Sequence, residues 1–423
     1  MSRFKQDVFL VAGLRTPFGR GGGALVGYDA LSLSVPVVNA MAKQIENGRP
    51  DVLIWGTVIP NFSWSNLARE IWLDAKLDPT VPAYSIVLAC STSMTAAFSA
   101  AGMIGPGVDV ALVGGAETMS RGPIGLTPAA TDHLRALITK NPAEAAAALS
   151  KLTPQDFALP VKGFANRITG LTMGEHMEIT AKAWGISREA QDEWAYNTHK
   201  RAAAGWENGF FSDLVIPLPE LAKDANPRAD TSLEKLASLE PVFDKKSGQG
   251  TLTAGNSTPI TDGAAGLWVT SEQGLKRLNA GPAVKLIDYE VAAVDWKVDG
   301  LLMAPPFAIT RLLARHGLKY EDIALWEIHE AFTAQVLANI AALENPSWIA
   351  ERTGITQDFG RFPRERVNPN GGSVAIGHPF GATGARDLSQ AVKELAGMPK
   401  GARAIVSVCA DGGHGTVALL ENV

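Results

Sequence analysis

One unit of sequence occurs twice in this chain and restricts the folds that the chain can adopt. In the first half, the small residues that follow Cys90 lead into the apolar run VDVALVGGAETMS, which ends at a glycine pair. In the second half, the small residues around GHPFGATGAR lead into ARAIVSVCADGGHG, which again runs from an apolar segment into glycines. Each copy predicts a helix, a strand and a glycine turn. The repeat indicates a duplicated fold with a site between its halves, although α/β proteins in general reuse this unit.

The pattern along the rest of the chain favours the same class. Apolar runs predict buried strands within residues 7–13, 50–59 and 109–120, and residues 65–77 have the spacing of a helix. Strands that alternate with helices predict a mixed sheet covered by helices.

The middle of the chain differs in composition and predicts an inserted domain. Residues 122–251 are rich in proline, lysine and amphipathic helical pattern. We therefore expect three parts: an N-terminal half formed by 1–121 and 252–280, a loop domain formed by 122–251, and a C-terminal half formed by 281–423.

Composition and charge exclude several classes of function. The 423 residues are 46% hydrophobic and 19% charged, with a formal net charge of −5, which argues against a general nucleic-acid binder. The longest apolar stretches are interrupted by charge within about a dozen residues, so no membrane span is expected. The N-terminus does not resemble a secretory signal, and we expect a cytoplasmic protein. Two cysteines could form one disulfide, but they are too few for a four-thiolate zinc site.

Cys90 lies at a predicted strand-to-helix junction. The positive end of a helix dipole favours a thiolate and lowers the pKa of a thiol. Because the thiolate is the nucleophile, this place suits covalent catalysis. The alternative is a buried structural cysteine.

His378 lies within GGSVAIGHPFGATGAR, residues 371–386, among an unusual number of small residues. Imidazole exchanges a proton near neutral pH, which suits a catalytic site. The glycines would let a bulky ligand pass against the backbone and could aim N–H groups at an anion. Alternatively, the histidine could simply hydrogen-bond a carbonyl.

Three further residues lie where predicted strands end, which is where α/β sheets place their sites. Cys409 follows an apolar strand, and it could instead be a core cysteine. His329 could donate an Nε2–H hydrogen bond to an oxyanion or cap the following helix. Glu330 could orient a neighbouring imidazole or act as a first-turn acid.

Eight motifs in order make the chain resemble the thiolases, which are acetyl-CoA acyltransferases, over nearly its whole length. They are RTPFG, ACSTSMTAA, GGAETMS, MGEHMEITAKAWGISREAQDEWA, TAGNSTPITDGAA, HEAFTAQ, GGSVAIGHPFGATGAR and CADGGHG. The commoner short-chain thiolases carry asparagine at the position of His329. The histidine and the long inserted loop resemble the thiolase subunit of fatty-acid β-oxidation complexes.

The resemblance implies a duplicated αβαβα layered fold with an inserted loop domain, and a mechanism. Cys90 would attack the keto carbonyl of a 3-ketoacyl-CoA while His378 takes its proton. Acetyl-CoA would leave as an enolate that Cys409 protonates. Free CoA would then release the shortened acyl group from Cys90.

The resemblance also implies two sets of oxyanion donors. His329 and His378 would serve the enolate oxygen. The backbone N–H of Cys90, with that of Asp411 or Gly412, would serve the tetrahedral intermediate. Asp411 departs from the family, where glycine or alanine is usual. Because a carboxylate would repel an enolate, we expect its side chain to point away from the pocket.

For the substrate, the resemblance implies that the loop domain holds CoA. Arg228 matches a position that faces the nucleotide end, and Met173 and Thr258 match positions that line the pantetheine tunnel. Their alternatives are a surface arginine, a core methionine and a turn threonine. CoA is a substrate, and no metal or redox cofactor is expected.

Other functions and partners stay open. The same residues would serve a biosynthetic acetoacetyl-CoA thiolase, and a ketoacyl synthase-like enzyme or a non-catalytic lipid-binding subunit are more distant alternatives. The resemblance implies a homodimer or tetramer, with a possible hydratase/dehydrogenase partner chain. The amphipathic stretch near 128–152 could dock a partner or touch a membrane, or could be an ordinary packed helix.

Overall fold

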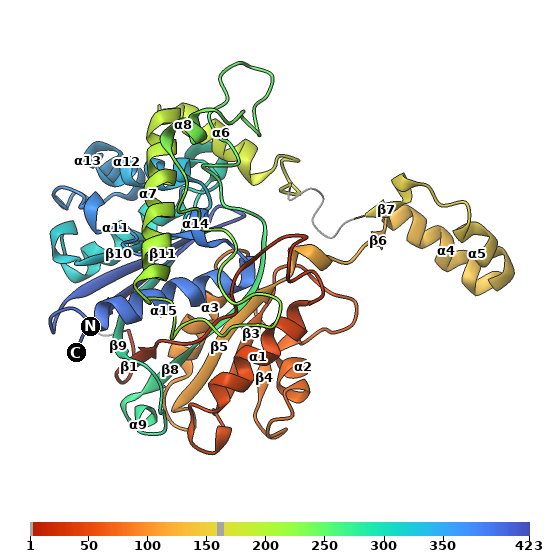
Figure 1. Cartoon of the computed structure of the whole chain (residues 1–423), viewed down its shortest axis with the longest axis horizontal. Helices are drawn as coiled ribbons and strands as arrows, with labels where there is room; N and C mark the ends of the chain where they lie inside the picture. The colour runs from red at the N-terminus through yellow and green to blue at the C-terminus, as the bar shows by residue number, and fades with distance from the viewer. Residues whose placement is uncertain (1–2, 159–164) are drawn as a thin grey trace.

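The structure is a computed structural model that describes residues 3–158 and 165–423 (Figure 1). Its strands are β1 (Val8–Val11), β2 (Gly19–Arg20), β3 (Val52–Gly56), β4 (Ala83–Tyr84), β5 (Val110–Glu117), β6 (Gly125–Leu126), β7 (Phe157–Ala158), β8 (Thr261–Ser271), β9 (Ala283–Ala293), β10 (Leu325–Ile328), β11 (Arg403–Ala410) and β12 (His414–Glu421). Its α-helices are α1 (Ala30–Ala42), α2 (Leu67–Asp74), α3 (Thr92–Met103), α4 (Pro128–Lys140), α5 (Pro142–Leu149), α6 (Met173–Ala183), α7 (Arg188–Glu207), α8 (Leu233–Ala237), α9 (Glu272–Leu275), α10 (Trp296–Asp299), α11 (Ala304–His316), α12 (Thr333–Leu343), α13 (Pro346–Thr353), α14 (Ser373–Ile376) and α15 (Thr383–Ala396).

The main sheet repeats one pairing pattern. Its order is β10-β11-β12-β9-β1-β8-β5-β3-β4, with β2 paired to β8. From β1, the sheet continues through antiparallel β8 and antiparallel β5 to parallel β3. From β9, it continues through antiparallel β12 and antiparallel β11 to parallel β10. The two runs meet where β1 pairs antiparallel with β9. The predicted mixed α/β class is confirmed.

Both faces of the sheet are buried, as its continuous apolar strands predict. Along β5, Ala111 and Val113 contribute to one apolar cluster, while Val110 and Leu112 contribute to another. Because successive side chains of a strand point to opposite faces, a strand buried on both sides shows no polar alternation.

Helices α3 and α15 occupy equivalent places in the two runs and pack against each other near the middle of the molecule (Figure 1). A Cβ on Gly384 of α15 would lie 2.6 Å from the Cβ and the backbone nitrogen of Met94 in α3. The backbone N–H of Ala385 donates to Ser93 Oγ at 2.8 Å across the same contact. This close approach brings the N-terminal ends of the two helices together, and the site lies there.

A buried ion pair attaches the loop region to the sheet. Arg15 Nη1 lies 2.6 Å from Asp224 Oδ1, and the backbone N–H of Phe18 donates to the same oxygen at 2.8 Å. Trp206 Nε1 of α7 donates to the other carboxylate oxygen at 3.1 Å. The RTPFG motif therefore fixes the segment that leads to Arg228.

The hairpin of α4 and α5 is set apart from the body in Figure 1. Its buried side chains, Ala130, Leu134 and Ala145, pack within the hairpin, and β6 pairs with β7 at its base. The stretch near 128–152 is thus packed mainly on itself. Among the described residues, no helix is long and apolar enough to cross a lipid bilayer.

Candidate active site

Cys90 lies in a tight turn immediately before α3. The backbone N–H of Leu88 donates to Thr92 Oγ1 at 2.9 Å, and that hydroxyl donates to the carbonyl of Ala89 at 2.7 Å. Ala89 has a φ of +43°, a conformation that residues with a side chain rarely adopt. The turn is therefore strained, and it presents a half-buried thiol at the start of the helix.

Two imidazoles lie beside this thiol. Cys90 Sγ and one nitrogen each of His329 and His378 lie within 4.8 Å of one another. The two rings are 4.1 Å apart between centroids. Each ring has a buried Nε2 for which the described part of the chain offers no hydrogen-bond partner. The structure thus brings together three of the four predicted catalytic side chains around two free nitrogens.

Hydroxyl groups hold the other nitrogen of each ring. His329 Nδ1 lies 2.8 Å from Ser373 Oγ, and His378 Nδ1 lies 2.6 Å from Thr383 Oγ1. The backbone N–H of His378 also donates to Thr261 Oγ1 at 2.7 Å. Both rings are therefore held through Nδ1, which leaves each Nε2 available beside the thiol cluster.

Burial keeps the thiol and both imidazoles neutral. Desolvation, followed by the charge of Asp411, raises the pKa of Cys90 to about 12. Desolvation, followed by the charge of Arg386, lowers the pKa of His378 to about 3. Desolvation also lowers the pKa of His329 well below its ordinary value. The expectation that the helix dipole lowers the pKa of Cys90 is wrong, because the cost of burying a thiolate outweighs the dipole.

Cys409 lies near the end of β11 with no exposed surface, within an apolar cluster that includes Leu252 and Phe332. Burial and the nearby Cys90 raise the pKa of Cys409 well above its usual value. Both cysteines are free thiols, so the disulfide left open by the sequence does not form. Cys409 therefore retains a proton that it could deliver.

The Asp411 carboxylate is held by two hydrogen bonds, and its charge still acts on Cys90. Its Oδ1 accepts hydrogen bonds from Asn166 Nδ2 at 2.8 Å and from the backbone N–H of Gly412 at 2.7 Å. Its charge nevertheless raises the pKa of Cys90, whereas its backbone N–H favours the thiolate and lowers that pKa. The side chain is thus paired but not removed from the field of the thiol.

The same contacts correct the predicted oxyanion donors. The N–H of Gly412 is occupied by the Asp411 carboxylate and is not free to bind an oxyanion. The backbone N–H of Asp411, which lowers the pKa of Cys90, is the remaining predicted donor in this turn.

Glu330 fills neither of its two predicted roles. Its carboxylate accepts hydrogen bonds from Trp194 Nε1, Thr198 Oγ1, Asn368 Nδ2 and the backbone N–H of Val374, at 2.8 to 3.2 Å. It precedes α12, which begins at Thr333, and so is not a first-turn acid. Glu330 instead connects α7 to the segment that carries His378.

Glu117 is a comparable residue that the sequence reasoning missed. Its carboxylate accepts from the hydroxyl of Thr57 and from the backbone N–H groups of Val58, Ile59 and Gly381. Burial raises its pKa to about 7. Its place within GGAETMS gave no signal, because its partner Gly381 is 264 positions away along the chain.

The glycines around His378 pack against the protein itself. Gly377 has a φ of +115°, and a Cβ there would lie 2.9 Å from Thr261 and 3.0 Å from Asn226 Nδ2. Gly384 packs on α3 as described above. The expectation that these glycines leave room for a ligand is therefore wrong at both positions, where they permit close packing.

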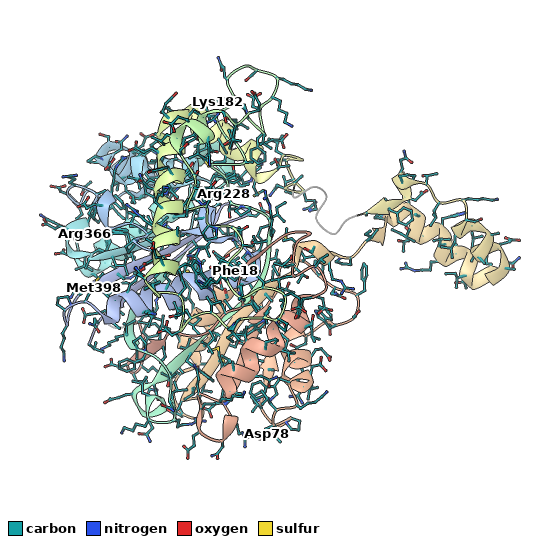
Figure 2. All side chains as sticks on the ribbon, in the orientation of Figure 1. Phe18, Asp78, Lys182, Arg228, Arg366 and Met398 are labelled. Atoms are coloured by element: carbon teal, nitrogen blue, oxygen red, sulfur yellow. The ribbon has the colours of Figure 1, made fainter. Side chains whose placement is uncertain are left out.

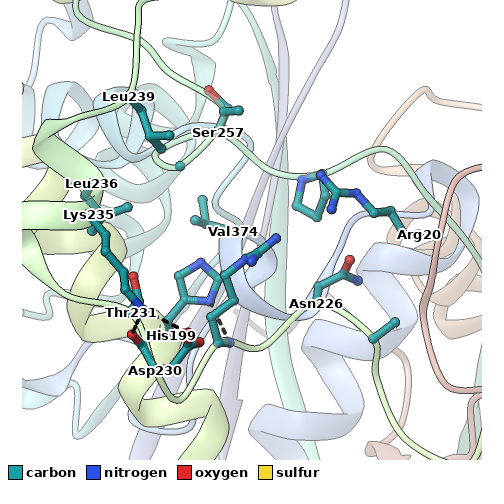
Figure 3. A pocket seen from close by; sticks show the side chains of 15 residues that line it. Arg20, His199, Asn226, Asp230, Thr231, Lys235, Leu236, Leu239, Ser257 and Val374 are labelled. Atoms are coloured by element: carbon teal, nitrogen blue, oxygen red, sulfur yellow. Dashed lines mark hydrogen bonds and ion pairs between the residues drawn. The ribbon is translucent and has the colours of Figure 1, made fainter.

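A pocket of about 350 Å³ opens beside the segment that precedes His378 (Figure 3). Arg20 faces it from one side, and Lys235 and His199 face it from the other (Figure 3). Arg228, also among its lining residues, lies over the middle of the body in Figure 2. Val374 of α14 lines the same pocket. The side chains of Arg20, Arg228 and Lys235 thus line a pocket beside the segment that precedes His378. Of these three, only Arg228 was predicted from the sequence.

The other two predicted CoA-binding residues lie elsewhere. Thr258 is not among the pocket's lining residues, and its hydroxyl donates to the carbonyl of Ser373 at 2.8 Å. Met173 begins α6 and packs against the apolar cluster that contains Cys409. Thr258 thus supports α14, and Met173 lies at the edge of the Cys409 environment.

Comparison with known proteins identifies the family. Residues 8–273 match the thiolase N-terminal domain, and residues 280–422 match the thiolase C-terminal domain. The chain is 38% identical to a 3-ketoacyl-CoA thiolase of Pectobacterium carotovorum, covering all of this chain and 98% of the relative, and 36% identical to one of Photobacterium profundum, covering 99% and 98%.

Solved structures agree with this result. An acetyl-CoA acetyltransferase of Bacillus anthracis superposes with a TM-score of 0.82 at 33% identity, covering all of both chains. The Acat5 thiolase of Ascaris suum, solved in complex with coenzyme A, superposes with a TM-score of 0.80 at 27% identity, covering 99% of this chain and all of that one. The chain therefore belongs to the thiolase family.

Proposed function

We propose that the protein cleaves 3-ketoacyl-CoA with CoA, giving acetyl-CoA and an acyl-CoA shortened by two carbons, as in fatty-acid β-oxidation. The observation that carries this proposal is the cluster of Cys90 Sγ with one nitrogen each of His329 and His378, two rings whose Nε2 atoms have no partner among the described residues. The relatives named 3-ketoacyl-CoA thiolase support the substrate class.

In the first half-reaction, His378 Nε2 takes the thiol proton as Cys90 Sγ bonds to the keto carbon. Because the resting thiol and imidazole are both neutral, the thiolate forms only during attack. The backbone N–H of Asp411, with that of Cys90, stabilises the tetrahedral oxyanion. One such donor contributes about 3 kcal/mol to catalysis.

The carbon–carbon bond then breaks, leaving an acyl thioester on Cys90 and acetyl-CoA as an enolate. Cys409 gives its proton to the enolate carbon while His329 donates a hydrogen bond to the enolate oxygen. In the second half-reaction, Cys409, which has lost its proton to the enolate, takes the proton of free CoA. The CoA sulfur attacks the thioester and leaves with the shortened acyl group, and the released Cys90 sulfur takes back its proton from His378.

We infer that the pocket lined by Arg20, Arg228 and Lys235 holds the phosphates of CoA. Guanidinium and ammonium groups are the usual partners of phosphate, and Val374 connects this pocket to the segment that carries His378. CoA is a substrate in this scheme, and no metal or redox cofactor takes part.

The division into halves 1–121 with 252–280 and 281–423, separated by a loop domain at 122–251, is also proposed. We also propose that the protein assembles as a homodimer or tetramer, with a possible hydratase/dehydrogenase partner chain. A biosynthetic acetoacetyl-CoA thiolase is a second candidate, favoured by the similarity to a solved acetyl-CoA acetyltransferase.

The test compares cleavage of acetoacetyl-CoA and a long-chain 3-ketoacyl-CoA by the purified full chain. Preference for the long chain supports the degradative function, whereas equal or better use of acetoacetyl-CoA supports the second candidate. Cys90→Ala should abolish cleavage of both. Cys409→Ala should block cleavage. The variant should still accept an acyl group from an acyl-CoA, because no enolate carbon has to be protonated in that half-reaction. An active Cys90→Ala protein would overturn the mechanism.

A further inference from the structure

A buried chain of three side chains leads from Arg386 to the active-site imidazole of His329. Arg386 is 2% exposed, and its Nη2 donates to Ser373 Oγ at 2.6 Å. Ser373 Oγ in turn lies 2.8 Å from His329 Nδ1. The mechanism above assigns no role to Ser373 or Arg386, so the function of this buried contact is still to be explained.

The direction of these hydrogen bonds follows from the chemistry of guanidinium. Arginine has N–H donors and no acceptor, and it stays protonated in proteins. Ser373 Oγ must therefore accept from Arg386, and among its described contacts His329 Nδ1 is the one group that can accept the serine proton. Nδ1 of His329 then accepts, which places the ring proton on Nε2.

We propose that Arg386 and Ser373 are positioning residues that fix His329 in its Nε2–H tautomer, so that this ring can only donate to the enolate oxygen. The inference rests on the proposed thiolase function. The low pKa of His329, caused by burial and by the charges of His378 and Arg386, agrees with a ring that is neutral and carries a single proton.

The neighbouring ring has the opposite arrangement. Thr383 Oγ1 donates to the carbonyl of Pro379 at 3.0 Å, so its lone pairs face His378 Nδ1 at 2.6 Å. Nδ1 of His378 then carries the proton, and its Nε2 presents a lone pair to Cys90. Ser373 thus donates to Nδ1 of one histidine, and Thr383 accepts from Nδ1 of the other. As a result, His329 presents a hydrogen-bond donor at Nε2 and His378 presents a base.

Further contacts fix the serine in place. Its carbonyl accepts from Thr258 Oγ1 at 2.8 Å and from the backbone N–H of Gly377 at 2.9 Å. Arg386 itself is held by Glu327 at 3.2 Å and Asp387 at 2.6 Å. The serine oxygen is therefore held between guanidinium and imidazole.

The first test is the tautomer of the wild-type full chain, read by nitrogen NMR of protein labelled with [15N]histidine. The spectrum of His329→Asn identifies the signals of His329 by difference. We expect an unprotonated Nδ1 and a protonated Nε2 for this residue. The reverse assignment would overturn the proposal, and no substituted serine is needed to see it.

The second test separates the two half-reactions in Ser373→Ala. We expect cleavage of 3-ketoacyl-CoA to fall by about 10- to 100-fold, since removing one oxyanion donor outright costs about 100- to 1000-fold. Acylation of Cys90 by an acyl-CoA forms no enolate, so its rate should stay within about threefold of the wild-type rate. A change of this size is too small for the loss of an oxyanion donor. Ser389→Ala, which removes another buried hydroxyl from the contacts of α15, is the matched control and should leave both reactions unchanged.

A Ser373→Ala protein that cleaves at the wild-type rate would overturn the proposal, as would equal losses in both half-reactions. Absence of cleavage by the wild-type chain would instead overturn the proposed function, and the tautomer measurement would then decide the positioning role by itself.

Discussion

At the scale of single residues, the main feature of the site is a nucleophile that is protonated at rest. Cys90 and His378 lie together, yet burial moves their pKa values apart, to about 12 and about 3. A thiolate–imidazolium pair, as in many cysteine enzymes, requires the opposite order of pKa values. Here the free thiol is protected from stray electrophiles until a substrate carbonyl arrives.

This predicts how Cys90 reacts with iodoacetamide in the free protein. Below its pKa, the thiolate fraction rises tenfold per pH unit, so the alkylation rate should climb without a plateau between about pH 7 and 9. Asp411→Asn removes a charge that raises the pKa of Cys90, so it should speed alkylation severalfold at pH 8. Asp132→Asn, on the distant α4, makes the same change of net charge and should have no effect. A plateau near neutral pH would show a preformed ion pair.

Sequence reasoning found the reacting groups but not the groups that control them. Cys90, His378, Cys409 and His329 stand in recognisable motifs, and the structure places three of them within one cluster. The hydroxyl of Ser373 and the altered pKa values depend on packing between distant segments, which local patterns do not encode. For the same reason, the helix-dipole argument for Cys90 gave the wrong direction.

At the scale of elements, the site depends on the contact between α3 and α15. These helices begin close to Cys90 and His378, so the distance between their axes controls the distance between the two side chains. The sequence predicted both helices and the strands that follow them, because apolar runs and small-residue stretches are local signals. The sequence did not predict that the small residues of α15 pack closely against α3.

Gly384→Ala tests this contact. The new methyl group would lie 2.6 Å from the Met94 backbone, and overpacking of this kind costs about 1–3 kcal/mol. Urea unfolding should show a lower midpoint, and cleavage should fall because the two helix ends move apart. Gly102→Ala in α3 is the control, since nothing lies within 4 Å of that position. It should be neutral or stabilising by about 0.5–1 kcal/mol. Equal stability of the two variants would show that the contact tolerates a wider spacing.

At the scale of the whole molecule, catalysis combines residues from both runs of the sheet. The nucleophile precedes α3, while the second cysteine lies near the end of β11 and the base precedes α15. The repeated unit in the sequence predicted a site between two halves. The strand-pairing pattern of the main sheet repeats in the same way. The hairpin of α4 and α5 was not predictable as a separate feature, because an amphipathic helix that packs on its partner has the same pattern as one that packs on a core.

The hairpin provides the last prediction. The backbone N–H of Thr127 donates to the carbonyl of Asp156 at 2.8 Å, so a short Gly-Ser linker can replace residues 128–155 with little strain. Within the described part of the chain, the hairpin contributes no residue to the Cys90 cluster or to the pocket beside Arg228. The shortened protein should therefore cleave 3-ketoacyl-CoA at the wild-type rate and unfold at the same temperature. Leu134→Ala, which loosens the hairpin from within, is the matched control and should also keep full activity. If the shortened protein folds but loses cleavage while the control keeps it, the hairpin itself takes part in forming the active site.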